Sequence, residues 1–417
     1  MEPTRWRSVR SCGCGARGSF EALASRMRAQ QSWMIVLVVF YIAAVGCRPT
    51  MDEPTLSDAE AVRSHLDALV RDSKTPGLQY LVVAPDQTVF EYAGGWADIA
   101  GRRPMNSATT MMAYSMSKTI TAAAMLQLVE AQKVNLDAPI DRYLDSQPYG
   151  PGVTVRQLLS HTSGIPNPIP LAWVHPAARH ATFDERAALA TVLREHPKLS
   201  SAPGTKYGYS NIGYWLLGPI IEQASGESFP SYVRTHVLRP LGITPEELGY
   251  VVPDKGNSAK GYLEKYSWMN LVKSFLIDRT FVGGYEGRWL HIHDHYLNGP
   301  AFGGLVGTAR GFGTFLQDQL RPHSKLFNDT TRELFNTPVR ATSGTDIPMS
   351  LGWHIGTLNG ARFLYKEGGG GGFHCMMRVY PVSRIATIVM TNATGFDARG
   401  FLDLIDPRFL NASNGRR

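Results

Sequence analysis

Strand-like segments lie near both ends of the folded part of this 417-residue chain, and the long middle is largely helical. Near the start, Leu78–Ala84 and Thr88–Tyr92 are separated by Pro85-Asp86-Gln87, which is typical of a turn. Near the end, Phe373–Pro381 and Arg384–Thr391 form a second pair. This arrangement predicts an α+β fold, in which an antiparallel sheet built from both chain ends is flanked by helices and carries an inserted, mainly helical lobe.

Apolar residues recur at helical spacing in two segments. Residues 58–71 are predicted to form an amphipathic helix that opens the domain, and a second helix is predicted from about Ser115 to Ala131. Residues 135–260 mix helical segments with Pro-Gly turns. We expect a leader over residues 1–47, a linker over 48–57, one folded domain over 58–398 and a C-terminal tail over 399–417.

The net charge of +7 is concentrated in the leader. Residues 1–46 hold six arginines and two acidic residues, so the rest of the chain carries only +3. A nearly neutral body gives no basis for a nucleic-acid partner.

The leader contains fourteen uncharged residues, Trp33 to Gly46. A spanning helix needs about 18 apolar residues, so this length favours a signal peptide. The stretch ends at Ala44-Val45-Gly46-Cys47, which resembles the lipobox of bacterial lipoproteins although Ala44 stands where Leu is usual. Lipidation of Cys47 would place the protein in the cell envelope, periplasmic or extracytoplasmic and anchored to the membrane. Translation from Met27 would give a leader of ordinary size, and an uncleaved N-terminal anchor is the alternative.

Three motifs carry the chemistry of the predicted site. Ser115-Met116-Ser117-Lys118 places Ser115 and Lys118 one helical turn apart, and a serine nucleophile needs a base within hydrogen-bond reach. Tyr209-Ser210-Asn211 offers a proton shuttle and an amide. In Lys366-Glu367-Gly368-Gly369, the glycines allow close approach of substrate, and a backbone N–H there would complete an oxyanion hole. The motif lacks a following G-K-[ST], which argues against a phosphate-binding loop.

Together these motifs resemble the serine β-lactamase and penicillin-binding-protein superfamily. The Tyr-Ser-Asn element is similar to its class C β-lactamase-like branch, which also contains D-aminopeptidases, D-Ala-D-Ala carboxypeptidases and carboxylesterases. Further matching segments are 135–140, 158–166, 239–242, 303–309 and 389–392.

The resemblance implies a serine hydrolase of the β-lactamase/transpeptidase-like fold that works without a cofactor or metal on a small-molecule or peptide-like acyl substrate. It implies Ser115 as the nucleophile of an acyl-enzyme, Lys118 as its base and Tyr209 as the proton shuttle. Asn211 would orient Lys118 and the substrate, Lys366 would supply positive charge, and the backbone N–H groups of Ser115 and Gly369 would form the oxyanion hole.

Glu367 departs from the family pattern, which has Thr after the Lys. A carboxylate there would repel a substrate carboxylate, since like charges 4 Å apart cost roughly 4 kcal/mol at an effective dielectric of about 20. It is also expected to pair with Lys366. We therefore expect an esterase or D-aminopeptidase-like activity rather than an efficient β-lactamase, with β-lactamase or D-Ala-D-Ala carboxypeptidase activity as the alternative.

Two hypotheses from other functional classes remain. His291-Ile292-His293-Asp294-His295 resembles a metallo-β-lactamase metal motif, and strand alternation would place its three histidines on one face. It is one residue short of that pattern, and residues 262–300 are expected to be an insertion near the pocket mouth. The other hypothesis is a non-catalytic binding protein of the cell envelope that retains the pocket but has lost turnover. Cys375 is the only cysteine of the body, so no disulfide forms there.

Overall fold

The computed structural model describes residues 59–271, 273 and 278–414. The chain divides into two units, Met1–Thr55 and Leu56–Arg417, and the fold reported below belongs to the second. The predicted leader, the linker and Cys47 lie outside the described residues. Within the described residues, none of the helices combines the length and apolar character that a membrane crossing requires.

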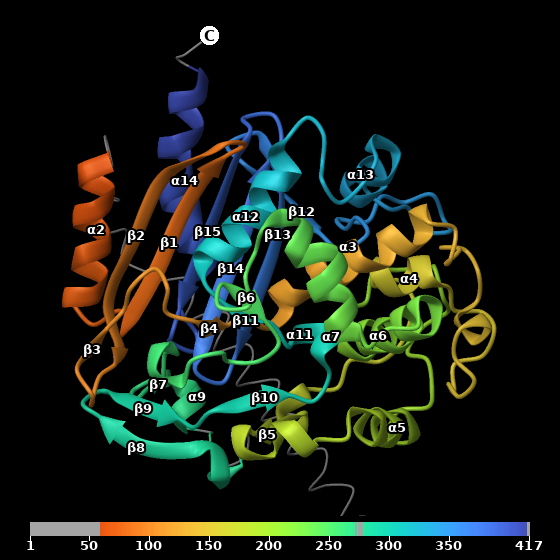
Figure 1. Cartoon of the computed structure of the whole chain (residues 1–417), viewed down its shortest axis with the longest axis horizontal. Helices are drawn as coiled ribbons and strands as arrows, with labels where there is room; N and C mark the ends of the chain where they lie inside the picture. The colour runs from red at the N-terminus through yellow and green to blue at the C-terminus, as the bar shows by residue number, and fades with distance from the viewer. Residues whose placement is uncertain (1–58, 272, 274–277, 415–417) are drawn as a thin grey trace, which may run out of the picture. The chain divides into compact units, whose positions relative to one another are not determined.

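A seven-stranded antiparallel sheet is built from both ends of the domain, as predicted (Figure 1). Its spatial order is β12-β13-β14-β15-β1-β2-β3, so the last strand, β15, pairs with the first, β1. The strands are β1 (Gly77–Ala84), β2 (Gln87–Asp98), β3 (Arg103–Pro104), β12 (His354–Leu358), β13 (Ala361–Gly370), β14 (Phe373–Tyr380) and β15 (Ile385–Thr391).

The central strands are apolar on both faces because helices cover both faces. In β1, Tyr80 and Val82 point to one side, and Leu81 and Val83 point to the other. The first side packs against α2 (Ala59–Arg71) and α14 (Ala398–Asn414). The second side packs against α12 (Ala309–Leu320) and the helical lobe, as Figure 1 shows.

The prediction of a C-terminal tail over residues 399–417 is wrong. Residues 398–414 form α14, and Phe401, Leu402 and Ile405 are buried against the sheet. The buried guanidinium of Arg378 on β14 reaches Asp406 on this helix at 3.2 Å. A sheet that is apolar on both faces needs a cover on the second face, and α14 supplies it.

The inserted lobe surrounds α3 (Ser117–Glu130), which is buried on nearly all sides because its Ala and Thr side chains are small enough for neighbouring helices to approach closely. Its other helices are α4 (Val155–Leu159), α5 (Glu185–Glu195), α6 (Asn211–Ser225), α7 (Phe229–Tyr232), the π-helical η5 (Val233–Leu238), α8 (Arg239–Leu241), α11 (Pro300–Gly303) and α13 (Asp329–Asn336). The 3-10 helices are η1 (Tyr114–Met116), η2 (Ile140–Arg142), η3 (Pro170–Ala172), η4 (Ala177–Thr182), η6 (Lys255–Asn257) and η7 (Arg279–Phe281).

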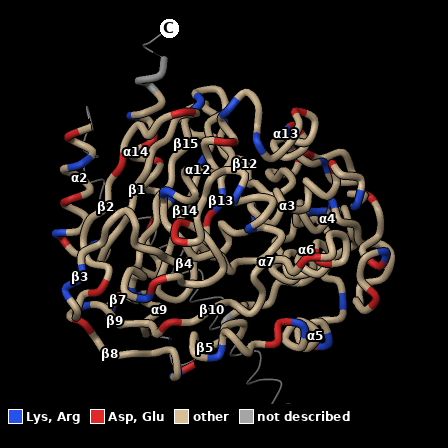
Figure 2. The backbone as a smooth tube through the Cα atoms, in the orientation of Figure 1, with Lys and Arg blue, Asp and Glu red and all other residues tan. Residues whose placement is uncertain are grey.

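Three small sheets complete the domain. One is formed by β7 (Gly261–Glu264), β8 (Val282–Glu286) and β9 (Trp289–Ile292), with α9 (Trp268–Leu271) beside it. The others pair β10 (His295–Leu297) with β5 (Val174–Pro176), and β11 (Val306–Gly307) with β4 (Met111–Met112) and β6 (Leu248–Gly249). Figure 2 shows that basic and acidic residues are interspersed over the described chain.

Candidate active site

Ser115 lies in η1, immediately before α3, rather than in the first turn of a regular α-helix. The residue before it, Tyr114, has φ of +45°, a conformation that is strained for a bulky side chain. Its hydroxyl lies 2.7 Å from the carbonyl oxygen of Gly371 and 3.0 Å from Nε2 of His295. These contacts fix the turn that presents Ser115.

Lys118 lies beside Ser115, as the spacing of the motif predicts. Its Nζ lies 3.0 Å from Oγ of Ser115, 2.8 Å from Oδ1 of Asn211 and 2.5 Å from the carbonyl oxygen of Phe302. The side chain is fully buried, and burial, with the nearby charge of Lys366, lowers the pKa of Lys118 well below its usual value. A neutral amine has two N–H donors for Asn211 and Phe302, which leaves its lone pair for the Ser115 hydroxyl.

Tyr209 and Asn211 enter the site from the segment that starts α6. The side chain of Ser210 caps the helix by accepting a hydrogen bond from the Gly213 N–H. The Tyr209 hydroxyl donates to Oγ of Ser115 at 2.8 Å. Burial raises the pKa of Tyr209, so its phenol is protonated at neutral pH. The Asn211 amide is oriented by Asn167, whose Oδ1 accepts from both the backbone N–H and Nδ2 of Asn211.

Lys366 on β13 is a second buried lysine near the phenol of Tyr209. Its Nζ lies 5.3 Å from the centre of the Tyr209 ring and has no hydrogen-bond partner among the described residues. Burial lowers the pKa of Lys366 to about 7. Two lysines with lowered pKa values therefore flank one tyrosine.

The expected pairing of Glu367 with Lys366 is wrong. Successive side chains of a strand point to opposite faces, and Glu367 points away from Lys366. Its carboxylate contacts Nε2 of His374 at 2.8 Å and a guanidinium nitrogen of Arg399 at 3.7 Å. The hydrogen bond from His374 is the main reason that the pKa of Glu367 is lowered.

The glycine-rich half of β13 is an open sheet edge next to Ser115. The strand β12 pairs only with residues 361–365 of β13, so residues 366–370 have no strand partner on that side among the described residues. A Cβ atom at Gly368 would lie 2.2 Å from the carbonyl oxygen of Ala113, so only glycine allows β13 to approach the Ser115 turn this closely.

A cavity of about 320 Å³ opens beside Ser115. Asn211 and Gly369 line it together with Ser115, whereas Lys118, Tyr209, Lys366, Glu367 and Gly368 do not. The segment 262–300, predicted to lie near the pocket mouth, does contribute to the cavity, since Leu263, Met269, Phe281 and Ile292 belong to the lining.

A sequence profile described as Beta-lactamase matches residues 62–406. The chain belongs to this family. Its α+β architecture and its antiparallel sheet agree with the fold that the sequence motifs imply.

Two curated proteins show what this beta-lactamase family member is similar to. The chain is 26% identical over 310 residues to penicillin-binding protein 4* of Bacillus subtilis, and the match covers 73% of this chain and 65% of that protein. The chain is 27% identical over 351 residues to a D-aminopeptidase of Brucella canis, and that match covers 83% of this chain and 61% of the D-aminopeptidase. The chain thus spans less than two-thirds of the length of these relatives.

Solved structures share its fold. A penicillin binding protein from Bacillus halodurans matches with a TM-score of 0.64 and 25% identity, over 82% of this chain and 98% of the other. The D-amino acid amidase from Ochrobactrum anthropi SV3, in complex with L-phenylalanine amide, matches with a TM-score of 0.69 and 21% identity, over 86% and 100%.

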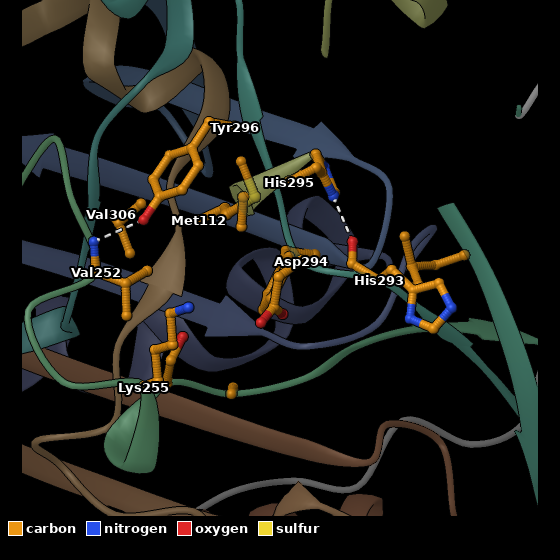
Figure 3. Close-up of a pocket in the computed structure, with 13 residues that line it drawn as sticks. Met112, Val252, Lys255, His293, Asp294, His295, Tyr296 and Val306 are labelled. Carbon is orange, nitrogen blue, oxygen red and sulfur yellow. Dashed lines mark hydrogen bonds between the residues drawn. The ribbon is translucent and has the colours of Figure 1, made fainter. Parts of the chain in front are cut away.

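The histidines of 291–295 do not share one strand face in this family member. The strand β9 ends at Ile292 and β10 starts at His295, so the alternation that the prediction assumed is broken. Figure 3 shows the side chains of His293 and Asp294 pointing in different directions, and Nδ1 of His295 bonded to the His293 carbonyl oxygen. Among the described residues, no three His, Cys, Asp or Glu side chains are grouped in a way that would hold a metal ion.

Three groups at the site were missed by sequence reasoning. The Phe302 carbonyl that binds Lys118 is a backbone atom and leaves no sequence signal. Asn167 follows the matched segment 158–166 directly, which is a signal that could have been used. His161 lies in that segment; its ring contacts the Tyr209 ring with centres 4.3 Å apart and planes tilted by 36°, and its Nδ1 accepts from the Ser210 N–H.

Proposed function

We propose that this chain is a serine hydrolase that forms an acyl-enzyme on Ser115 and cleaves an ester or an amide. The observation that carries the proposal is the contact of one hydroxyl oxygen, Ser115 Oγ, with both Lys118 Nζ and Tyr209 OH, at 3.0 and 2.8 Å. The arrangement fulfils the requirement for a nucleophile with a base in hydrogen-bond reach. The names of the relatives, D-aminopeptidase and D-amino acid amidase, support amide cleavage.

The two contacts define a balanced proton path. Lys118 Nζ accepts the Ser115 proton as Oγ bonds to the carbonyl carbon of the substrate. Tyr209 then donates its proton to the leaving oxygen or nitrogen as that atom separates from the carbon, and the protonated Lys118 restores the phenol. In deacylation, water takes the place of the leaving group, its proton passes to the same pair, and Ser115 regains a proton.

The open edge of β13 supports an oxyanion hole at this site. We propose that the backbone N–H groups of Ser115 and Gly369 donate to the developing oxyanion, because β13 approaches the Ser115 turn closely at Gly368. Lys366 stays outside the cavity and acts by its charge, which lowers the pKa of Lys118.

Labelling with a fluorophosphonate tests the nucleophile. The wild-type chain should be labelled and should hydrolyse at least one of three substrate types: p-nitrophenyl esters, D-amino-acid amides or nitrocefin. Ser115→Ala should lose both signals, whereas Ser343→Ala, which changes an exposed serine far along the chain, should keep both. An unlabelled wild type with no turnover would favour the non-catalytic binding protein.

We also propose export and lipidation at Cys47, with the protein held at the envelope membrane. The support is the uncharged stretch of fourteen residues and the Ala44-Val45-Gly46-Cys47 sequence at its end. In a bacterial host, palmitate should label the wild-type chain and not Cys47→Ser. Equal labelling of both would contradict the proposal.

A further inference from the structure

The cavity beside Ser115 is lined by Ser115 and Gly369, whose backbone N–H groups form the proposed oxyanion hole. Lys118, Tyr209 and Lys366 are absent from its lining. The leaving atom must receive its proton from Tyr209, so the leaving group departs on the Tyr209 side. The cavity is therefore placed to hold the acyl half of the substrate.

The lining is mainly apolar. Among the described residues that form it, none is Lys, Arg, Asp or Glu. Most of the aliphatic and aromatic members come from three separate parts of the chain, residues 169–174, residues 263–297 and α11; they are Ile169, Pro170, Val174, Leu263, Met269, Phe281, Ile292, Leu297 and Phe302.

Three polar side chains of the lining, those of Tyr114, His295 and Thr394, already have hydrogen-bond partners within the chain. The Tyr114 hydroxyl contacts Gly371 and His295, and Nδ1 of His295 contacts the His293 carbonyl oxygen. The Thr394 hydroxyl donates to the Gly370 carbonyl oxygen and accepts from the Gly372 N–H. A charged substrate group in this cavity would lose its hydration without gaining an ionic partner, which is strongly unfavourable.

We infer that the cavity selects an uncharged, apolar acyl group longer than acetyl, and that it disfavours an acyl group with a free amine or a free carboxylate. The inference rests on the proposed function and narrows its substrate class. It separates this chain from an enzyme that must hold the free α-amine of a D-amino acid, because a buried ammonium requires a carboxylate or several acceptors. The occupant is instead a fatty or aryl acyl group, or an acyl group whose amine is blocked.

A series of p-nitrophenyl esters tests the inference on the wild-type chain. Acetate, butyrate and hexanoate are compared with two charged relatives of hexanoate, the 6-aminohexanoate and the adipate monoester. The kcat/KM of each ester is divided by the rate constant for its hydrolysis by hydroxide. The value of kcat/KM should rise roughly fourfold per added methylene until the cavity is filled. Each charged ester should be about 100-fold poorer than hexanoate.

A pair of variants at one lining position sharpens the test. Val174 is half-buried on β5 and lines the cavity. Val174→Asp should lower kcat/KM for hexanoate by at least about 10-fold and raise it for 6-aminohexanoate, whereas Val174→Asn should lower the former without raising the latter. Fluorophosphonate labelling of Ser115 in each variant serves as the measure of folding and of an intact nucleophile.

The outcomes separate the inference from the proposed function. If the esters are hydrolysed with equal kcat/KM for acetate and hexanoate, or if 6-aminohexanoate is as good as hexanoate, the inference is overturned and the serine hydrolase stands. If no ester or amide is hydrolysed and Ser115 is not labelled, the proposed function fails. If Val174→Asp leaves the preference unchanged while acetate hydrolysis is retained, the acyl group does not occupy this cavity.

Discussion

The two sides of Ser115 differ in nearly every physical property. On one side, two buried lysines, two buried tyrosines and two histidines pack together, and their pKa values are shifted by burial; they are Lys118, Lys366, Tyr209, Tyr214, His161 and His354. The cavity that opens beside Ser115 is mainly apolar, and none of its described lining residues is Lys, Arg, Asp or Glu. The difference indicates that proton transfer and acyl recognition are separate, so each can be altered without the other.

The largest expected effect is on the proton-transfer side. Lys118→Met removes the lone pair that accepts the Ser115 proton and keeps an apolar chain in its place. We expect kcat/KM to fall by about 1,000-fold or more for all acyl chain lengths alike. Lys133→Met, which changes an exposed lysine just beyond α3, is the control and should keep wild-type rates. If Lys118→Met lowered kcat/KM only for esters with long acyl chains, proton transfer and acyl recognition would not be separate.

The next effect is a shift in pH dependence. Activity requires neutral Lys118, so kcat/KM falls as pH drops through the pKa of this lysine. The charge of Lys366 lowers that pKa, and Lys366→Met should therefore move the acidic limb of the profile to higher pH. At neutral pH the rate should drop roughly 10-fold. An unchanged limb would show that the two lysines are not coupled.

The same substitution should stabilise the fold at neutral pH. The pKa of Lys366 is about 7 in the folded chain and near 10.5 when exposed. The folded state therefore binds fewer protons than the unfolded state between these values, and stability rises with pH across that window. Lys366→Met removes the unfavourable burial of this charge. Urea denaturation at pH ~7 should therefore show a free energy of unfolding that is about 1–3 kcal/mol higher than that of the wild type. The gain should vanish above pH ~10.5, and a gain that is constant with pH would point to packing alone.

Glu367→Thr is expected to have the smallest effect. The carboxylate is partly compensated by His374 and Arg399, so its repulsion of a substrate carboxylate is weaker than an isolated charge would give. Nitrocefin hydrolysis should rise by less than about 10-fold, and hexanoate hydrolysis should not change. Glu333→Thr, at an exposed glutamate, is the matched control. Efficient nitrocefin hydrolysis by the wild type would refute the role given to Glu367.

Local patterns were enough to predict the outline of the fold. The apolar runs Leu78–Ala84 and Arg384–Thr391 became the paired strands β1 and β15, because a strand covered on both faces is apolar throughout. The role of α14 was missed. The sequence of residues 398–414 does not by itself show that one face of the sheet would be exposed without a helix there.

The candidate site was predicted in part. The spacing of Ser115 and Lys118 gave their contact directly, and the contacts of Tyr209 and Asn211 with them followed from the family resemblance. The direction of Glu367 was not foreseen, although strand alternation after a buried Lys366 contains that information. The cavity was beyond reach, because residues 169–174, 263–297 and 302 meet only in the folded chain.

The separation of the two sides of Ser115 is tested most directly by the ratio of kcat/KM for p-nitrophenyl hexanoate to that for the acetate, measured on the wild-type chain from pH ~5 to pH ~10. We predict that both values fall together at low pH as Lys118 is protonated, while their ratio stays well above one and constant. A ratio near one, or a ratio that changes with the protonation of Lys118, would contradict the account.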